Sequence, residues 1–518
     1  MFSKLTFGQK LAVWLGCALA IVIASIVAIS IQMAKNPPKD VEQFINNELF
    51  GRKFYTDEDW ANEEREASAE LEKNSKSAYW YARRASARWS LSNYEGSEAD
   101  YTRAIELDPT DANSLASRAA LRGYDEKYKE ALADATKAIS INPKDGWPYM
   151  IRADIYRRMG KFEEALKDTD KCLETDSDKR DAYSTRAEIY KKMHRYDKSI
   201  EAYEEAITYR KPRRSDNCFD ELVQLYIITG RLKEAQTACR KWIVDNQPPE
   251  DAYRFYANVS KALRDKESEE EAYKKYLAFI SQKIANAPTE TDNYATRGSI
   301  YDKISEPEKA RFDYLDFLEG SDLSGLTAPR KILQAGKLFD RVGQSEKKTE
   351  LYHSAIERCT QELKTAPNDA RLYSCRAQLF AAQDNPKAAK DFETADKLEH
   401  STAATLAYAE FALKTKQYDL AIKLATEIAD YDEATAYAFQ SAVFNAMGKR
   451  KMALRFASEA LEKDPFLPAA YYWLSKARAA SGETAEAARK LKQATAFGYD
   501  PKVSMFEKED YKDEGQED

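Results

Sequence analysis

The residues that most often perform chemistry in proteins are sparse in this sequence, and they do not cluster. The three histidines, His194, His353 and His400, stand far apart, and none lies in an H-E-x-x-H pattern that would place two zinc ligands on one helix face. None of the six cysteines pairs in a C-x-x-C spacing, so we expect most of them to be small buried residues. The sequence also has no glycine-rich phosphate loop. We therefore expect no catalytic residue, no metal site, no cofactor and no enzyme.

Length and composition indicate a folded chain with extensive surface. The chain has 518 residues, of which 43% are hydrophobic and 12% aromatic, so it can bury a large core. Charged residues make up 32% but nearly cancel, leaving a net charge of −7. A surface of mixed sign does not favour nucleic acid as the main partner, and nothing points to a small-molecule substrate.

An uncharged segment near the N-terminus, residues 11–34, predicts a transmembrane helix. At about 1.5 Å per residue it is long enough to cross a hydrocarbon core of ~30 Å, which needs about 20 residues. We expect a single-pass membrane protein, with membrane association through this segment. The alternative is a cleaved signal peptide, for which Ala28-Ile29-Ser30 offers a weak cleavage site.

The charges that flank this segment leave its orientation open. Lys4 and Lys10 form a short basic tail, which favours a cytoplasmic N-terminus and an extracytoplasmic soluble domain. Four basic residues follow within about twenty positions and argue for the opposite orientation; they are Lys35, Lys39, Arg52 and Lys53. The extracytoplasmic arrangement is the favoured expectation.

The rest of the chain repeats itself with a period of 34 residues. ADYTRAIELDPTDA (99–112) and ADATKAISINPKDG (133–146) match at this offset, and their prolines can be set at position 32 of a common frame. Position 4 of the frame is then aromatic in Tyr81, Tyr149, Tyr183, Tyr294, Tyr373, Tyr437 and Tyr471. Position 8 is small in Ala85, Ala119, Ala153, Ala187, Gly298 and Ala377. Position 20 is alanine in Ala131, Ala165, Ala235, Ala310, Ala421, Ala453 and Ala487.

This pattern predicts two helices in each unit. Large and small residues recur at helical spacing, so that small positions allow two helices to cross closely while aromatic rings fill the space beside them. Glycine near position 15 marks the turn between the helices, in Gly160, Gly230, Gly343, Gly448 and Gly482. One such hairpin cannot bury its apolar face alone, so stacked neighbours must cover it.

The frame resembles the tetratricopeptide repeat (TPR), which also favours aromatic residues at positions 4, 11 and 24 and alanine at 20 and 27. Tyr101 with Ala104, and Tyr203 with Ala206, match positions 24 and 27. The resemblance implies an all-α fold, a right-handed superhelical solenoid of about twelve helix-turn-helix units. The second helices before Pro288 and Pro367 look extended, and the unit near Ala370 looks one residue short.

The predicted organisation has seven parts. They are an N-terminal tail (1–10), the transmembrane helix (11–34), a tether with a short helix (35–77), TPR units one to five (78–250), irregular TPR-like units with extended helices (251–369), C-terminal TPR units (370–501) and an acidic tail (502–518).

The resemblance also implies a binding groove, because positions 2, 5, 9, 12 and 13 face the concave side in TPR proteins. The residues we single out there are Tyr79, Trp89, Asn113, Tyr124, Trp147, Met150, Arg157, Arg158, Lys191 and Lys192. Aromatic and methionine side chains beside basic ones suit an extended, partly acidic protein segment. The alternative is that several of these aromatics pack sideways onto neighbouring helices. The recurrent arginine at position 7 is expected to bond along or between helices, with a basic ladder as its alternative.

We therefore expect a membrane-anchored scaffold or adaptor that binds other proteins or peptides through its concave groove. The alternative is a structural subunit of a multiprotein envelope, secretion or assembly complex. An enzyme would require an unrecognised fold within residues 251–369.

Overall fold

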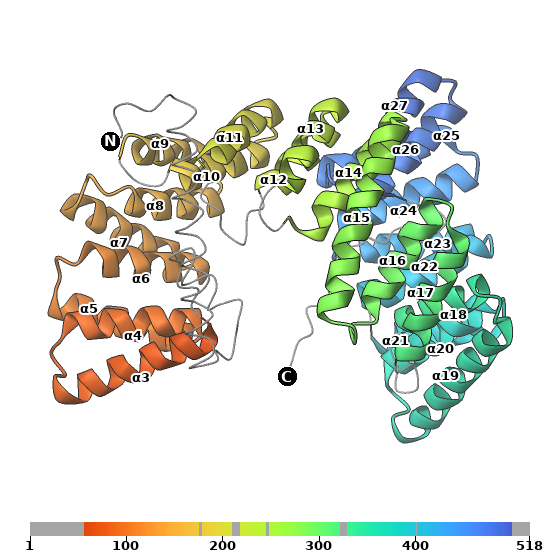
Figure 1. Cartoon of the computed structure of the whole chain (residues 1–518), viewed down its shortest axis with the longest axis horizontal. Helices are drawn as coiled ribbons and strands as arrows, with labels where there is room; N and C mark the ends of the chain where they lie inside the picture. The colour runs from red at the N-terminus through yellow and green to blue at the C-terminus, as the bar shows by residue number, and fades with distance from the viewer. Residues whose placement is uncertain are drawn as a thin grey trace, which may run out of the picture. The chain divides into compact units, whose positions relative to one another are not determined.

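The computed structural model describes residues 56–175, 179–209, 218–244, 248–321, 329–399 and 401–499. These residues form 25 helices and no strand, which confirms the all-α prediction (Figure 1). The predicted tail 1–10, the predicted transmembrane helix 11–34, the first part of the tether and the acidic tail 502–518 lie outside the described residues. No helix within the described ranges is long and apolar enough to cross a membrane.

The chain divides into two compact units, of which the first ends at Thr185 and the second begins at Arg186. Unit 1 holds α3 to α9 and the beginning of α10. Its helices are α3 (Asp57–Lys73), α4 (Ala78–Ser90), α5 (Tyr94–Leu107), α6 (Ala112–Tyr124), α7 (Tyr128–Ile141), α8 (Trp147–Arg158), α9 (Phe162–Leu173) and α10 (Lys179–Lys192).

Unit 2 continues the helical hairpins. Its helices after α10 are α11 (Tyr196–Thr208), α12 (Cys218–Ile228), α13 (Leu232–Ile243), α14 (Glu250–Leu263), α15 (Lys266–Asn286), α16 (Asp292–Lys303), α17 (Pro307–Gly320), α18 (Pro329–Arg341), α19 (Ser345–Thr365), α20 (Ala370–Ala382), α21 (Lys387–Leu398), α22 (Thr402–Lys414), α23 (Tyr418–Ile428), α24 (Glu433–Ala446), α25 (Arg450–Lys463), α26 (Pro468–Ala480) and α27 (Thr484–Ala496). From α4 to α27 the described helices pair into twelve hairpins, as the 34-residue period predicted.

The hairpins of unit 2 depart from the regular repeat at several places. The second helices α15 and α19 each run for 21 residues, longer than the other second helices. In most hairpins with the position-7 arginine, its aspartate partner lies 16 residues on, but Asp391 lies 15 residues after Arg376. The unit that begins at Ala370 is therefore one residue shorter, as predicted.

The small residues of the repeat form the packing seam. The alanines at positions 8 and 20 are buried, and Ala119 and Ala131 have no exposed surface. A β-carbon on Gly298, the position-8 residue of α16, would lie 2.6 Å from Cε1 of Tyr314 on α17. The two helices of this hairpin can therefore cross closely only because position 8 has no side chain.

The turn inside each hairpin uses one residue with a left-handed backbone. The five glycines predicted for this turn all have positive φ, between 72° and 85°. In the other seven hairpins a non-glycine residue takes the same position and conformation; these are Ser92, Glu126, His194, Arg264, Ser305, Asp384 and Lys416. His194 is thus a turn residue, with its Nδ1 2.8 Å from the Tyr196 hydroxyl.

The helix predicted within the tether is α3, and it packs on α4. Thr56 caps α3 through a capping box with Asp59, and Ala67 and Leu71 are buried. Arg84 of α4 donates to the Ser68 hydroxyl of α3 at 3.4 Å, in the same way that Arg118 of α6 donates to Thr102 of α5. Helix α3 therefore packs as the second helix of a repeat does.

Candidate functional site

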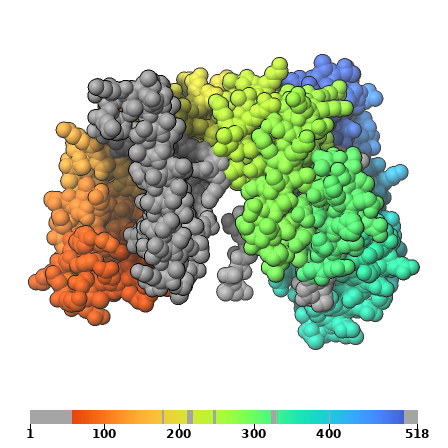
Figure 2. Space-filling view, viewed as in Figure 1, coloured from red at the N-terminus to blue at the C-terminus, as the bar shows by residue number. Residues whose placement is uncertain are grey.

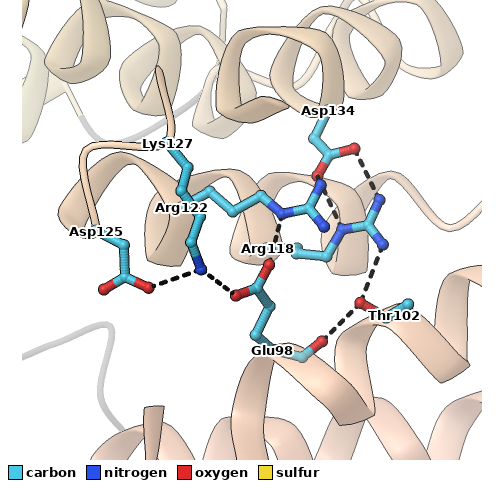
Figure 3. Close-up of polar contacts among 7 residues, drawn as sticks. All are labelled: Glu98, Thr102, Arg118, Arg122, Asp125, Lys127 and Asp134. Atoms are coloured by element: carbon cyan, nitrogen blue, oxygen red, sulfur yellow. Dashed lines mark hydrogen bonds and ion pairs between the residues drawn. The ribbon is translucent and has the colours of Figure 1, made fainter. Parts of the chain in front are cut away.

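The position-7 arginines connect helices in the interior and do not form a free basic ladder. Arg118 of α6 donates from Nε and Nη2 to both carboxylate oxygens of Asp134 on α7, each at 2.8 Å, and from Nη1 to Thr102 on α5 (Figure 3). The same two-oxygen pairing joins Arg84 to Asp100, Arg152 to Asp168, Arg297 to Asp313 and Arg376 to Asp391. The expectation that these arginines bond between helices is confirmed.

In the first two hairpins a second arginine joins this network. Arg122 donates to Asp134 at 2.9 Å and to Glu98 of the preceding hairpin at 2.7 Å, and Lys127 also contacts Glu98, at 2.9 Å (Figure 3). Arg88 joins Asp100 to Glu64 in the same way. Burial raises the pKa of Glu98, but the hydrogen bonds and charges of Arg122 and Lys127 outweigh burial and hold that pKa below its ordinary value. The Glu98 carboxylate therefore stays ionised, and these charged side chains hold neighbouring hairpins together.

Three aromatic side chains remain exposed on successive first helices of unit 1. The exposed fractions are 57% for Tyr79 on α4, 63% for Tyr124 on α6 and 46% for Trp147 on α8. Asn113 is also exposed, and Met150 is half-buried. Exposed aromatic rings on neighbouring helices are candidates for a contact surface, because tyrosine and tryptophan are enriched at protein interfaces.

Tyr124 is the centre of a small surface cluster. Its ring lies 5.9 Å from the ring of Tyr94 on α5, and the Arg158 guanidinium of α8 lies 5.7 Å from its centre. Asp154 accepts hydrogen bonds from Arg157 at 2.5 Å and from Arg158 at 2.8 Å. We call these five residues, Tyr94, Tyr124, Asp154, Arg157 and Arg158, the Tyr124 cluster.

The electrostatics of the Tyr124 cluster are set by Asp154. Burial raises the pKa of its carboxyl, but the hydrogen bonds and charges of Arg158 and Arg157 outweigh burial and lower the pKa below its ordinary value. The two arginines are therefore not free cations. The cluster offers an aromatic surface beside a guanidinium that a neighbouring carboxylate already holds in place.

The predicted groove residues differ in their exposure and contacts. Trp89 is half-buried and packs against Ala85, Tyr101 and Leu121. This agrees with the alternative that some of these aromatic side chains pack onto neighbouring helices. Lys191 and Lys192 belong to unit 2, where Lys191 pairs with Glu221 at 2.5 Å and Lys192 is exposed. Sequence reasoning missed Tyr94 and Asp154, although Asp154 occupies position 9, one of the positions expected to face the groove.

Unit 2 contains a cleft that the sequence did not reveal. It has a volume of about 720 Å³ and is lined mainly by the first helices α14, α16 and α18. Its lining includes Asp251, Arg254 and Lys303, with Ala295, Thr296 and Ser299 between them. Arg254 donates to Asp251 at 2.6 Å. We call this the unit 2 cleft; its signal in the sequence was only a set of small residues between charges.

The cysteines and histidines in the described part of the chain lie apart from a metal-binding arrangement. Cys172, Cys218, Cys239, Cys359 and Cys375 are buried free thiols, as expected, and burial raises the pKa of Cys239. His353 is exposed beside Glu357. The described residues include no group of three or more His, Cys, Asp or Glu side chains arranged to hold a metal ion.

Comparison with protein families gives two matches. The model of the tetratricopeptide repeat matches residues 80–111, and the model of the Psidin N-terminal TPR repeats region matches residues 124–356. The chain carries tetratricopeptide repeats. No curated protein matches the TPR chain in sequence.

Three solved structures align with the chain at low similarity. Yeast Tom70 is 15% identical, with a TM-score of 0.34, over 79% of this chain and 96% of Tom70. Naa15/Naa10 bound to HypK-THB gives 13% identity and a TM-score of 0.30 over 80% of each chain. PilF of Pseudomonas aeruginosa gives 13% identity and a TM-score of 0.33 over 41% of this chain and 92% of that chain.

Proposed function

We propose that this TPR chain is a scaffold or adaptor that binds another protein through unit 1. The observation that carries the proposal is the exposure of Tyr79, Tyr124 and Trp147 on three successive first helices. Tyrosine and tryptophan contribute large contact areas at low entropic cost, which is why they dominate the energetic centres of protein interfaces.

The partner chemistry follows from the Tyr124 cluster. The ring faces of Tyr94 and Tyr124 favour an apolar or aromatic side chain of the partner. The Arg158 guanidinium lies over Tyr124, and its N–H groups that do not contact Asp154 suit a partner carboxylate. An extended segment that combines an apolar residue with an acidic one is the occupant we propose.

Affinity capture with the full chain tests the proposal. We expect Tyr124→Ala combined with Trp147→Ala to reduce recovery of the associated protein at least tenfold. The matched control is Tyr431→Ala in unit 2, because Tyr431 is 68% exposed but does not belong to a first helix of unit 1. Equal recovery with both variants would contradict the role of unit 1.

The second candidate function is a structural subunit of an envelope, secretion or assembly complex. The observation that favours it is the presence of two separate surfaces, the Tyr124 cluster and the unit 2 cleft. Size-exclusion chromatography of a detergent extract separates the two functions, because an adaptor with one partner elutes near the summed mass of the pair and a subunit elutes with a large assembly.

We also propose that residues 11–34 anchor the protein in a membrane and that it acts without catalysis. The support for the anchor is the uncharged sequence of this segment. A reporter fused to the C-terminus, active on one side of the membrane only, tests the favoured extracytoplasmic orientation. A chain that stays in the membrane fraction after an alkaline wash is expected; full release would contradict the anchor.

A further inference from the structure

The end of unit 2 returns to its beginning. Helix α27 packs against α14 and also contacts α12, although more than 200 residues separate them in sequence. Figure 1 draws α27 beside α14, and Figure 2 shows the blue C-terminal segment next to the yellow-green one. The repeats from α12 to α27 therefore close on themselves within unit 2.

One side chain makes the central polar contact of this closure. The Gln493 amide on α27 donates to the main-chain oxygens of Ile227 at 3.0 Å and Ile228 at 2.9 Å. These are the last two residues of α12, and the Ile227 oxygen also accepts a hydrogen bond from the main-chain N–H of Gly230 at 3.0 Å. A primary amide has two N–H groups, so one glutamine serves both carbonyls. Gln493 is only 3% exposed, which makes these bonds costly to lose.

The apolar surface of α12 matches this contact. Ile227 occupies position 12 of its repeat and is fully buried. The same position holds exposed charged residues in the next two repeats, Lys261 and Asp302. A buried isoleucine there, in place of the charged residues of those two repeats, fits a helix end that another element covers.

A second contact joins the same hairpin to the start of unit 2. Phe466 lies in the turn that leads into α26, and the Lys191 Nζ lies 5.4 Å from the centre of its ring. Lys191 is in the part of α10 that belongs to unit 2. The hairpin α26–α27 thus contacts the beginning of unit 2 at two places.

We propose that the α26–α27 hairpin is a latch that closes unit 2 and holds α14 in place. Helix α14 has two roles in this arrangement. It contacts α27, and it also supplies Asp251 and Arg254 to the wall of the unit 2 cleft. Docking of the latch therefore sets the position of one cleft wall, and release of the latch frees it. In an open linear array the last repeat could not influence the first, because each repeat contacts only its neighbours.

Hydrogen–deuterium exchange of the full chain tests the latch without any partner. Gln493→Glu keeps the side-chain shape but replaces the NH₂ donor with a carboxylate oxygen that faces two carbonyl oxygens. We expect peptides from α12, α14 and α27 to exchange at least tenfold faster, while peptides from α18 to α21 keep their rates. The matched control is Gln383→Glu, the same change at an exposed residue, which leaves all rates unchanged.

Loss of protection in α27 alone, or in no helix, would overturn the proposal. If Gln493→Glu prevents folding, Gln493→Ala removes the two hydrogen bonds without adding a charge, and the same three helices must still lose protection together. This readout is independent of affinity capture through unit 1, so a failed latch and a failed binding function give different results.

Discussion

At the scale of the residue, the recurring unit of this protein is an arginine that joins an aspartate and a hydroxyl of two other helices. The position-7 arginine pairs with an aspartate of the second helix and donates to a hydroxyl of the preceding helix; for Arg152 these partners are Asp168 and Thr136. Where position 4 is a tyrosine, as Tyr149 is for Arg152, the guanidinium also lies over its ring. Buried ion pairs add little net stability compared with apolar packing, but their geometry is demanding. The trio therefore fixes how the two helices of a hairpin register against each other and against the previous hairpin.

The first prediction removes one member of this trio. Arg118→Ala leaves the Asp134 carboxylate, with 10% of its side chain exposed, buried and only partly compensated by Arg122. We expect the free energy of unfolding of unit 1 to fall by about 3 kcal/mol. The measurement is the midpoint of urea unfolding, with Arg103→Ala as the control, because Arg103 forms an exposed pair with Glu106. A midpoint shift as small as that of the control would contradict the structural role of the pair.

The second prediction concerns Asp220, in the first turn of α12. Burial raises the pKa of Asp220 to about 6; Asp251 and Glu221 add to the rise, while a hydrogen bond from Gln224 and the charge of Arg254 oppose it. The folded-state pKa is above the unfolded value, so the folded chain favours the protonated carboxyl of Asp220. The contribution of this carboxyl to the stability of unit 2 is complete below pH 4 and is lost as the pH rises through 6. Asp220→Asn should therefore stabilise unit 2 at pH 7.5 by about 2 kcal/mol.

Thermal unfolding at two pH values measures this effect. The variant and the original chain should have similar midpoints at pH 4, and the variant should unfold at a higher temperature at pH 7.5. Equal midpoints at both pH values would show that Asp220 ionises freely in the folded chain.

At the scale of the element, the turn and the two helices were largely predictable from sequence. Periodic alanine and aromatic residues predicted twelve hairpins and their packing seam, because small residues at the crossing point are a steric requirement. Only five of the twelve turns could be recognised by glycine, since residues such as Ser92 and Lys416 adopt the same left-handed backbone without its sequence signature. The Asp partner of the position-7 arginine could have been found from its recurrence 16 residues later.

The third prediction tests the turn. Lys416 has φ of 63° and is exposed, so Lys416→Gly should stabilise its hairpin by about 1 kcal/mol by removing the strain of a side chain in this conformation. Lys423 is an exposed lysine inside α23, and Lys423→Gly should lower the free energy of unfolding by about 1 kcal/mol, because glycine is unfavourable within a helix. Urea unfolding of both variants compares the two. Destabilisation by Lys416→Gly would contradict a left-handed turn.

At the scale of the whole molecule, the sequence predicted a repeat array but not its closure. The period describes contacts between neighbouring repeats, whereas the bond from Gln493 to Ile227 joins residues 266 apart and has no periodic signal. The exposure of the candidate binding residues was predictable only in part. Tyr79, Tyr124 and Trp147 are exposed, while Trp89 is half-buried against its neighbours, because family position alone does not determine how a large ring packs.

The proposed contact between unit 1 and a partner protein rests on the exposed aromatic residues of unit 1. The most direct measurement is site-specific photo-crosslinking in the native cell, with a photoreactive phenylalanine analogue at Tyr124 or Trp147 of the full chain and the same analogue at Tyr431 as the control. We predict a covalent adduct of one defined mass from Tyr124 and from Trp147, and none from Tyr431. Adducts of equal yield at Tyr431, or none at Tyr124 and Trp147, would contradict the account.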